Sequence, residues 1–176
     1  VNDSLAVVRT SAAPDAAIPD SISLLEVSDS GELSVVWNHQ PSTDEPSAPG
    51  WVARAGDVVT GWTKLPEGAG GGSGVVAYDL DDGSVAWTAE TSSFDNTRKQ
   101  IEANEELAVV TPMGGAWLDI FDARTGERRL REQAPAENIG SPYSVTAIDD
   151  GTMLFVGSVP EKEAKAPSVF FTFLRP

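Results

Sequence analysis

The chain has 176 residues, 40% of them hydrophobic, which is the length and composition of one globular domain with a substantial buried core. Its 27 acidic and 12 basic residues give a formal net charge of -15, and this charge makes nucleic acids and anionic lipid surfaces poor partners. The absence of cysteine excludes disulfides, thiolate metal sites and a cysteine nucleophile. No apolar run reaches the ~20 residues of a membrane-spanning helix.

Strand-forming residues dominate the first third of the chain. Residues 4–10 are rich in β-branched side chains and predict a strand, and residues 22–37 predict a hairpin that turns at Asp29-Ser30-Gly31. Residues 38–50 hold three prolines among small polar residues, which predicts a loop. Residues 51–62 alternate between apolar and polar side chains and predict one strand, and Gly56-Asp57 marks the start of its regular part.

The clearest hairpin follows a glycine-rich stretch, residues 67–74. That stretch has the glycine content of a phosphate-binding loop, but it lacks the Lys-Ser or Lys-Thr ending and precedes a strand, so we interpret it as a flexible connection. Residues 75–90 then predict two strands joined at Asp82-Gly83, a dipeptide that favours the positive φ of a tight turn. Residues 117–130 share this plan.

The remaining elements are also mostly strands. Residues 95–106 have the only helix-like composition in the chain, but they are short enough that a helix, a single turn and a polar loop are all open. Residues 107–111 predict a strand, residues 144–158 a hairpin, and residues 168–174 a last, mostly apolar strand.

The hairpins recur at a regular spacing. Gly31 and Gly83 lie about 52 residues apart and Gly83 and Gly126 about 43, a period that is typical of propeller blades. We therefore predict a single all-β domain of β-propeller-like blades of antiparallel sheet. It has about four units, which we place approximately at residues 1–40, 51–91, 105–133 and 143–176.

A family resemblance is carried by residues 77–87, Ala-Tyr-Asp-Leu-Asp-Asp-Gly-Ser-Val-Ala-Trp. They resemble the repeat Ala-x-Asp-x-x-Thr-Gly-x-x-x-Trp of the quinoprotein (pyrroloquinoline-quinone dehydrogenase-like) β-propellers. Residues 121–130 resemble it too, and residues 25–37 resemble it weakly, with Val27 in place of the aspartate. The resemblance implies structural roles alone: inter-blade packing residues Trp37, Trp87 and Leu130, and turn residues Gly31, Gly83 and Gly126.

The resemblance also sets expectations about completeness and cofactors. Members of the family usually have about six to eight blades, so we expect this chain to be part of a larger propeller, completed by a second propeller half or another copy. Its quinone enzymes use calcium and commonly an adjacent-cysteine disulfide. This chain has no cysteine and roughly half their length, so we place it in the non-enzymatic branch, without a quinone cofactor.

No residues stand out as catalytic or metal-binding. Asp79, Asp81 and Glu90 occupy positions 1, 3 and 12 of an EF-hand count, but Ser84 replaces the required glycine, so we interpret the stretch as a hairpin turn rather than a calcium site. His39 is the single histidine, and we interpret it as an exposed loop residue. We therefore predict neither a catalytic set nor a metal site.

Two tryptophans outside the repeat motif are the candidate contacts for a partner. Trp51 and Trp117 lie beside glycine or near proline, and we weigh surface anchoring against core packing for each. We expect a non-catalytic binding or scaffold module that recognises a protein partner. The alternative is a polysaccharide-acting hydrolase or lyase that uses loop carboxylates on a propeller face.

The same features suggest a place for the protein outside the cytoplasm. The chain starts at Val1 without a methionine, and we interpret it as a processed or trimmed form from which a signal peptide or membrane anchor has been removed. A cysteine-free, acidic composition is compatible with secretion or attachment to the cell envelope.

Overall fold

The structure is a computed structural model that describes residues 4–10, 20–67, 72–91, 99–112, 117–133, 142–149, 152–159 and 168–174. Its regular elements within these ranges are strands, β1 to β14, so the all-β prediction is confirmed. Among the same residues, no helix has the length and apolar character needed to cross a membrane.

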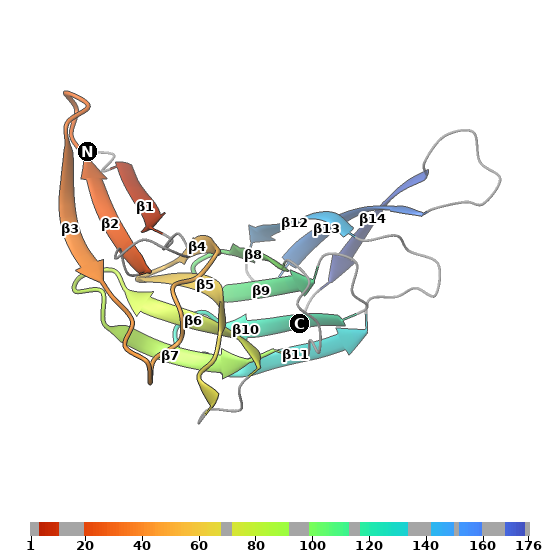
Figure 1. Cartoon of the computed structure of the whole chain (residues 1–176). Coiled ribbons are helices and arrows are strands. Elements are labelled where there is room, and N and C mark those ends of the chain that lie inside the picture. Colours follow the sequence, from red (N-terminus) through yellow and green to blue (C-terminus); the bar gives the residue numbers. More distant parts are fainter. Residues whose placement is uncertain are drawn as a thin grey trace.

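The strands form four antiparallel sheets that succeed one another along the chain (Figure 1). The first contains β1 (Ser4–Thr10), β2 (Ser21–Val27) and β3 (Leu33–His39). The second contains β4 (Trp51–Ala55), β5 (Val58–Lys64), β6 (Ser73–Asp79) and β7 (Val85–Glu90). The third contains β8 (Lys99–Ala103), β9 (Leu107–Pro112), β10 (Trp117–Asp122) and β11 (Arg128–Gln133). The fourth contains β12 (Pro142–Asp149), β13 (Thr152–Val159) and β14 (Ser168–Leu174).

In every sheet, strands that are consecutive in sequence are neighbours in space. Figure 1 shows the first sheet at one end of the molecule, the second and third in the middle, and the fourth at the other end. The predicted architecture of about four blade-like antiparallel sheets is therefore confirmed.

Two local predictions were wrong. Residues 51–62 form a hairpin rather than one strand, because Gly56 adopts φ +59 and reverses the chain, so that Trp51 lies opposite Trp62. The segment with helix-like composition contains a strand, β8, which pairs with β9 and buries Ile101. Pairing along the edge of a sheet overrides the weak helix propensity of a short polar segment.

The first three sheets carry a β-bulge at the same point of their hairpins. The register shifts between Leu24 and Leu25, between Ala77 and Tyr78, and between Ile120 and Phe121. Immediately before the bulge, the facing pairs are Leu24 with Trp37, Ala77 with Trp87, and Ile120 with Leu130. This shared register aligns the three sheets residue by residue, with Trp37, Trp87 and Leu130 at equivalent positions.

The core lies between neighbouring sheets. One cluster joins Ile22, Leu24 and Trp37 of the first sheet to Val59, Val76 and Tyr78 of the second. A second cluster packs Val75, Ala77 and Trp87 of the second sheet against Ala108, Val110 and Phe121 of the third. Strand β6 is consequently buried on both faces, which explains its nearly continuous apolar sequence.

Candidate docking surface

Trp37 connects the first sheet to the second. Its indole Nε1 donates a hydrogen bond of 2.9 Å to the carbonyl oxygen of Leu80, in the turn between β6 and β7. Its ring lies so close to Gly83 that a Cβ added there would be 2.6 Å from the indole Cδ2. The ring also packs 6.2 Å, centroid to centroid, from the buried ring of Tyr78.

Trp87 makes the same contact one sheet further on. Its Nε1 donates to the carbonyl oxygen of Ala123 at 2.9 Å, and a Cβ on Gly126 would be 2.6 Å from its Cδ2. The ring of Phe121 lies 6.4 Å from that of Trp87. At each junction, a face of one sheet packs on a face of the next sheet along the chain. We call the face that carries the tryptophan the trailing face. We call the face of the next sheet, which is bordered by the glycine turn, the leading face.

The turn at Gly31 differs from these two turns. Gly31 also has a positive φ, +80, but no atom lies within 4 Å of a Cβ built on it. The hairpin of β2 and β3 continues past its bulge through three residue pairs, Leu25 with Val35, Glu26 with Ser34, and Val27 with Leu33, whereas the second and third sheets have one pair there. The turn is therefore displaced beyond the position at which a tryptophan covers Gly83 and Gly126.

The leading face of the first sheet is apolar and exposed. Val35 and Leu33 are 64% and 60% exposed, and Val8 on β1 is 43% exposed. Register places Leu25 opposite Val35 and Val27 opposite Leu33, on this same face. The residues equivalent to Leu25 are Tyr78 and Phe121, and both are fully buried beneath a neighbouring sheet.

The large hydrophobic residues that are exposed concentrate in this sheet. In the part of the chain whose burial the structure describes, they are Val8, Leu33, Val35, Val36 and Trp51. Val36 is the extra residue of the bulge and lines a hollow between the first and second sheets. The face formed by Val8, Leu25, Val27, Leu33 and Val35 is therefore the candidate docking surface.

The two tryptophans predicted to contact a partner begin strands in different sheets. Trp51 starts β4 and is 51% exposed. Trp117 starts β10, where its backbone pairs with Gln133, and its side chain lies outside the described residues. Trp51 is thus available to a partner.

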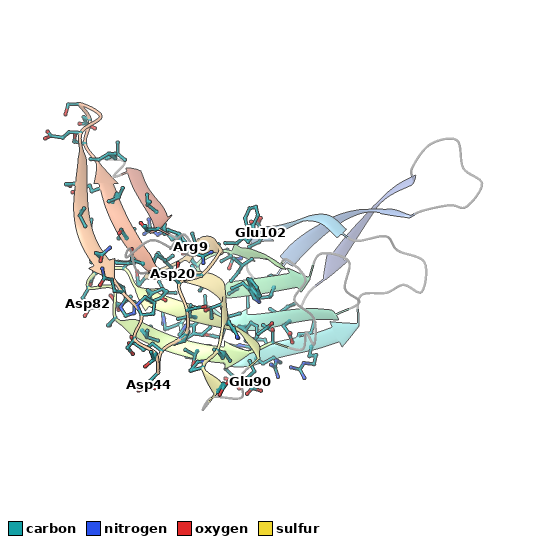
Figure 2. The ribbon with its side chains drawn as sticks, in the orientation of Figure 1. Arg9, Asp20, Asp44, Asp82, Glu90 and Glu102 are labelled. Carbon is teal, nitrogen blue, oxygen red and sulfur yellow. The ribbon has the colours of Figure 1, made fainter. Side chains whose placement is uncertain are left out.

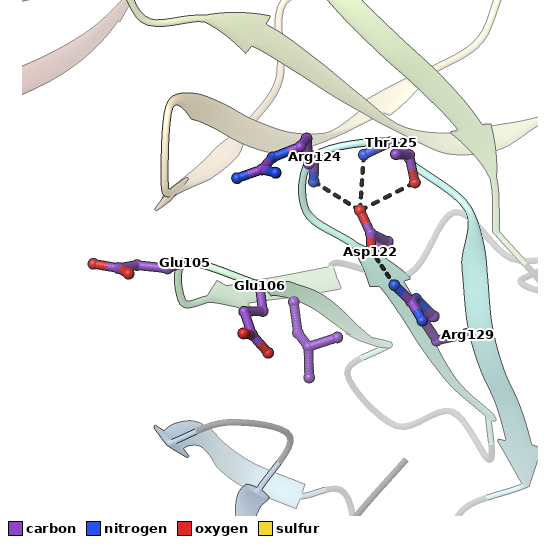
Figure 3. A pocket seen from close by; sticks show the side chains of 7 residues that line it. Glu105, Glu106, Asp122, Arg124, Thr125 and Arg129 are labelled. Carbon is purple, nitrogen blue, oxygen red and sulfur yellow. Dashed lines mark hydrogen bonds and ion pairs between the residues drawn. The ribbon is translucent and has the colours of Figure 1, made fainter.

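A charged groove of about 680 Å³ opens beside the third sheet (Figure 3). The residues that line it are Glu105, Glu106, Leu107, Asp122, Arg124, Thr125 and Arg129. Asp122 accepts hydrogen bonds from the backbone N–H groups of Arg124 (3.1 Å) and Thr125 (2.9 Å), from the Thr125 hydroxyl, and from the Arg129 guanidinium. The Arg129 bond, with the bonds from Thr125 and Arg124, lowers the pKa of Asp122 to about 2.

Acidic residues recur at equivalent turns of the second and third sheets. The N–H of Leu80 donates to the carbonyl oxygen of Asp57 at 3.0 Å, and the N–H of Ala123 donates to that of Glu106 at 2.7 Å. Asp79 occupies the position of Asp122, and its Oδ1 accepts the N–H of Asp81 at 2.8 Å. The aspartates at these hairpin turns therefore hold the turns in shape.

His39 is not the exposed loop residue that the sequence suggested. It is the last residue of β3, its side chain is 18% exposed, and its ring centroid lies 5.1 Å from that of Tyr78. His39 Nε2 and the Tyr78 hydroxyl have no hydrogen-bond partner among the described residues, and Glu45 Oε2 lies 3.7 Å from Nε2. Burial, and secondarily the charge of Glu45, raise the pKa of Tyr78 well above its usual value.

The prediction missed this environment because Tyr78 belongs to the neighbouring sheet, and no local pattern reveals that contact. As for metals, the described ranges contain no cluster of three or more His, Asp or Glu side chains arranged to hold an ion.

The stacked antiparallel sheets and their recurring tryptophan contacts define an all-β fold of the propeller-blade type. No family model matches the sequence, and no curated protein matches it. Among solved structures, the chain is similar to BamB from Moraxella catarrhalis, with 18% identity and a TM-score of 0.48 over 96% of this chain and 51% of that one. The chain spans about half the length of that structure.

Proposed function

We propose that the protein is a non-catalytic binding or scaffold module that recognises a protein partner. The observation that carries this proposal is the exposed apolar leading face of the first sheet, on which Val35 and Leu33 are the most exposed hydrophobic residues. Contiguous exposed apolar surface on an otherwise polar protein marks sites of association, because covering it removes apolar area from water. Trp51, half exposed on the second sheet, offers an additional aromatic contact.

Asp122, which lines the charged groove, does not have the properties of a general acid. A general acid needs a carboxyl group whose pKa is raised towards neutrality. Asp122 has the opposite perturbation, because Arg129 and the turn hydrogen bonds stabilise its ionised form. Its oxygens are already occupied by these four donors, so the carboxylate maintains the turn.

The proposal includes a family and a location. We assign the chain to the non-enzymatic branch of the quinoprotein-like β-propellers, on the strength of residues 77–87 and 121–130 and of the matching tryptophan contacts. We further propose that it forms part of a larger propeller, completed by a second half, and that it works in an extracytoplasmic compartment. Its acidic, cysteine-free composition suits that compartment.

A capture experiment tests the binding function. The purified chain is used to retain proteins from the envelope fraction of its source, beside a Leu33→Asp/Val35→Asp variant and the single variants Trp51→Ala and Trp117→Ala. Ser34→Asp is the matched control, because Ser34 is exposed on the same strand but faces the other side of the sheet. A partner that the control retains and the double variant loses is the expected result; a partner retained by every variant would contradict the assignment of this face.

One observation favours the alternative function, a polysaccharide-acting hydrolase or lyase. Acidic residues occupy equivalent turns of the second and third sheets: Asp57 corresponds to Glu106, and Asp79 corresponds to Asp122. Glu106 and Asp122 also line the open groove beside the third sheet. Glycosidases use two carboxyl groups across such a groove. Turnover in a glycan screen that Glu106→Gln abolishes, in the absence of any captured protein, would establish this alternative.

A further inference from the structure

We propose that a hollow between the second and third sheets binds a carboxylate group of the protein partner, held between the guanidinium groups of Arg54 and Arg124. This inference rests on the proposed function and specifies one chemical group through which the partner is recognised. The carboxylate belongs either to an acidic side chain or to the C-terminus of the partner. The hollow is separate from the exposed leading face of the first sheet.

The hollow has a volume of about 240 Å³ and lies where turns of the two sheets meet. Arg54 lines it from near the end of β4, and Arg124 lines it from the turn between β10 and β11. Gly56 lets the turns approach closely, since a Cβ built on it would be 3.2 Å from the carbonyl oxygen of Glu105. Because the hollow is smaller than the usual pocket for a drug-sized ligand, it suits a single small group.

The two arginines that line the hollow have no ionic partner among the described residues. Arg54 Nε donates a hydrogen bond to the carbonyl oxygen of Gly56 at 3.1 Å, and this bond holds the guanidinium beside its own turn. Figure 3 shows the Arg124 side chain pointing away from Asp122, whose carboxylate accepts its backbone N–H instead. The other arginines whose side chains the structure describes each form an ion pair with an aspartate: Arg9, Arg128, Arg129 and Arg131.

This pairing of two arginines is particular to the junction of the second and third sheets. Arg54 also lines the hollow between the first and second sheets. In that hollow Asp81 takes the position that Arg124 has in the third sheet, two residues after the aspartate that begins each turn. Of the two junctions whose side chains the structure describes, only the second therefore offers a guanidinium group from each side.

The charges and walls of the hollow favour a carboxylate. Asp57 and Glu105 also line it, so the charges of the two arginines are balanced locally. The chain as a whole carries -15, and its repulsion of a ligand grows with the ligand's negative charge, which favours a singly charged carboxylate over phosphate. Ala55 and Val58 are almost fully buried and form an apolar part of the wall, where charge-assisted hydrogen bonds from guanidinium groups are less screened than in open water.

Titration of the intact, isotope-labelled chain with small anions tests the inference, with nuclear magnetic resonance of the arginine Nε–Hε groups as the readout. The α-amide of N-acetylglutamic acid represents an acidic side chain, and N-acetylglycine represents a C-terminus. Sodium phosphate is the competing anion, and sodium chloride keeps the ionic strength constant. The variants Arg54→Gln and Arg124→Gln assign the two signals, and their amide spectra verify that each variant is folded.

Two controls separate binding in the hollow from general effects of charge. The Arg129 signal is the internal control, because its guanidinium already binds Asp122 at the neighbouring groove. Arg9→Gln is the matched variant, because it also removes one positive charge but lies outside the hollow, where Arg9 pairs with Asp20 at 3.8 Å (Figure 2). The capture experiment is repeated with the Arg54→Gln/Arg124→Gln double variant beside Arg9→Gln.

The expected result is a saturable shift of the Arg54 and Arg124 signals with at least one carboxylate, while the Arg129 signal stays in place. The carboxylate that binds more tightly identifies the source of the group. Arg54→Gln should weaken this binding, read from Arg124, by about tenfold or more, because it removes charge-assisted hydrogen bonds. Arg9→Gln should leave the affinity unchanged, and the double variant should retain less of the captured partner.

The inference would be overturned by the absence of a saturable shift, by tighter binding of phosphate than of both carboxylates, or by an equal shift of the Arg129 signal. Full retention of the partner by the double variant would also overturn it. In each of these cases the unmodified chain still captures its partner, and the binding function itself stands. Failure of the binding function is recognised separately, because no protein is then captured by the unmodified chain.

Discussion

Substituting Gly83 by alanine probes the contact that joins the first two sheets. At φ +73 the new side chain costs about 1–2 kcal/mol of left-handed backbone strain. Its Cβ would also lie 2.6 Å from Cδ2 and 2.7 Å from Cε3 of Trp37, so the indole must move. Overpacking of this kind costs about 1–3 kcal/mol, which gives a total loss of about 2–5 kcal/mol in the free energy of unfolding.

Gly31→Ala is the matched control for this experiment. Gly31 has nearly the same φ, +80, but no atom lies within 4 Å of the new Cβ. Backbone strain is therefore the only cost to the free energy of unfolding in this variant. Any entropic gain from removing a glycine from the unfolded chain is common to both variants and cancels in the comparison. We therefore expect Gly83→Ala to be less stable than Gly31→Ala by about 1–3 kcal/mol.

Equilibrium urea unfolding, followed by far-ultraviolet circular dichroism, measures both losses. Trp37→Ala is then combined with Gly83→Ala, and the extra cost of the Gly83 substitution should disappear in that background because the clashing ring is gone. Equal destabilisation by Gly83→Ala and Gly31→Ala would refute the packing argument, as would an extra cost that survives removal of Trp37.

Three further predictions concern the third sheet. Trp87→Phe removes the indole donor from the carbonyl of Ala123 and should cost about 1–3 kcal/mol in urea unfolding, whereas a loss within error would contradict a structural role for that bond. Asp122→Asn should destabilise the chain at neutral pH. Because the folded-state pKa is lowered to about 2, the stabilisation is complete above the ordinary value of 3.8 and is lost as the pH falls towards 2. The gap between the melting temperatures of wild type and variant should therefore close over that range, and a constant gap would count against the ionic interaction. The buried carboxylate of Asp119 lies 3.3 Å from Nε of Arg128 and 3.1 Å from Nε of Arg131. Asp119→Ala removes this shared partner and should lower stability by about 1–3 kcal/mol in thermal unfolding. Unchanged stability would exclude a stabilising role for these ion pairs.

The hairpins could be predicted because their signals are local. The glycines at positions 83 and 126 follow Asp or Thr after an alternating strand, and a positive φ at such a site needs no information from elsewhere in the chain. The repeat motif also predicts inter-blade packing for Trp37 and Trp87, and both side chains contact the neighbouring sheet. The hydrogen-bond acceptors, Leu80 and Ala123, lie 43 and 36 residues further along the chain, at separations that periodicity alone does not specify.

The errors arise where pairing between distant segments decides the structure. Strand β8 exists because β9 offers an edge, and its own composition is closer to that of a helix. Gly56 was predicted to mark the start of a strand, but it reverses the chain into the β4–β5 hairpin, which depends on the pairing of Trp51 with Trp62.

The candidate docking surface was missed for a similar reason. Its extent follows from the register of β2 and β3 and from the absence of a described neighbour over Leu33 and Val35. The signal in the sequence was the alternation of Leu25 and Val27 with Leu33 and Val35 around a long turn. That alternation shows which residues share a face, but it does not show whether the face is covered.

The tryptophan contacts couple each sheet to its immediate neighbour, so the chain resembles a linear array with nearest-neighbour cooperativity. In such an array an end unit is held from one side only and frays before the interior. Among the described sheets, the first is held on its trailing side by Trp37, while Leu33 and Val35 on its leading side are in water. Covering that side would slow its hydrogen exchange and raise the unfolding temperature, so any molecule that binds there would also stabilise the first sheet against local unfolding.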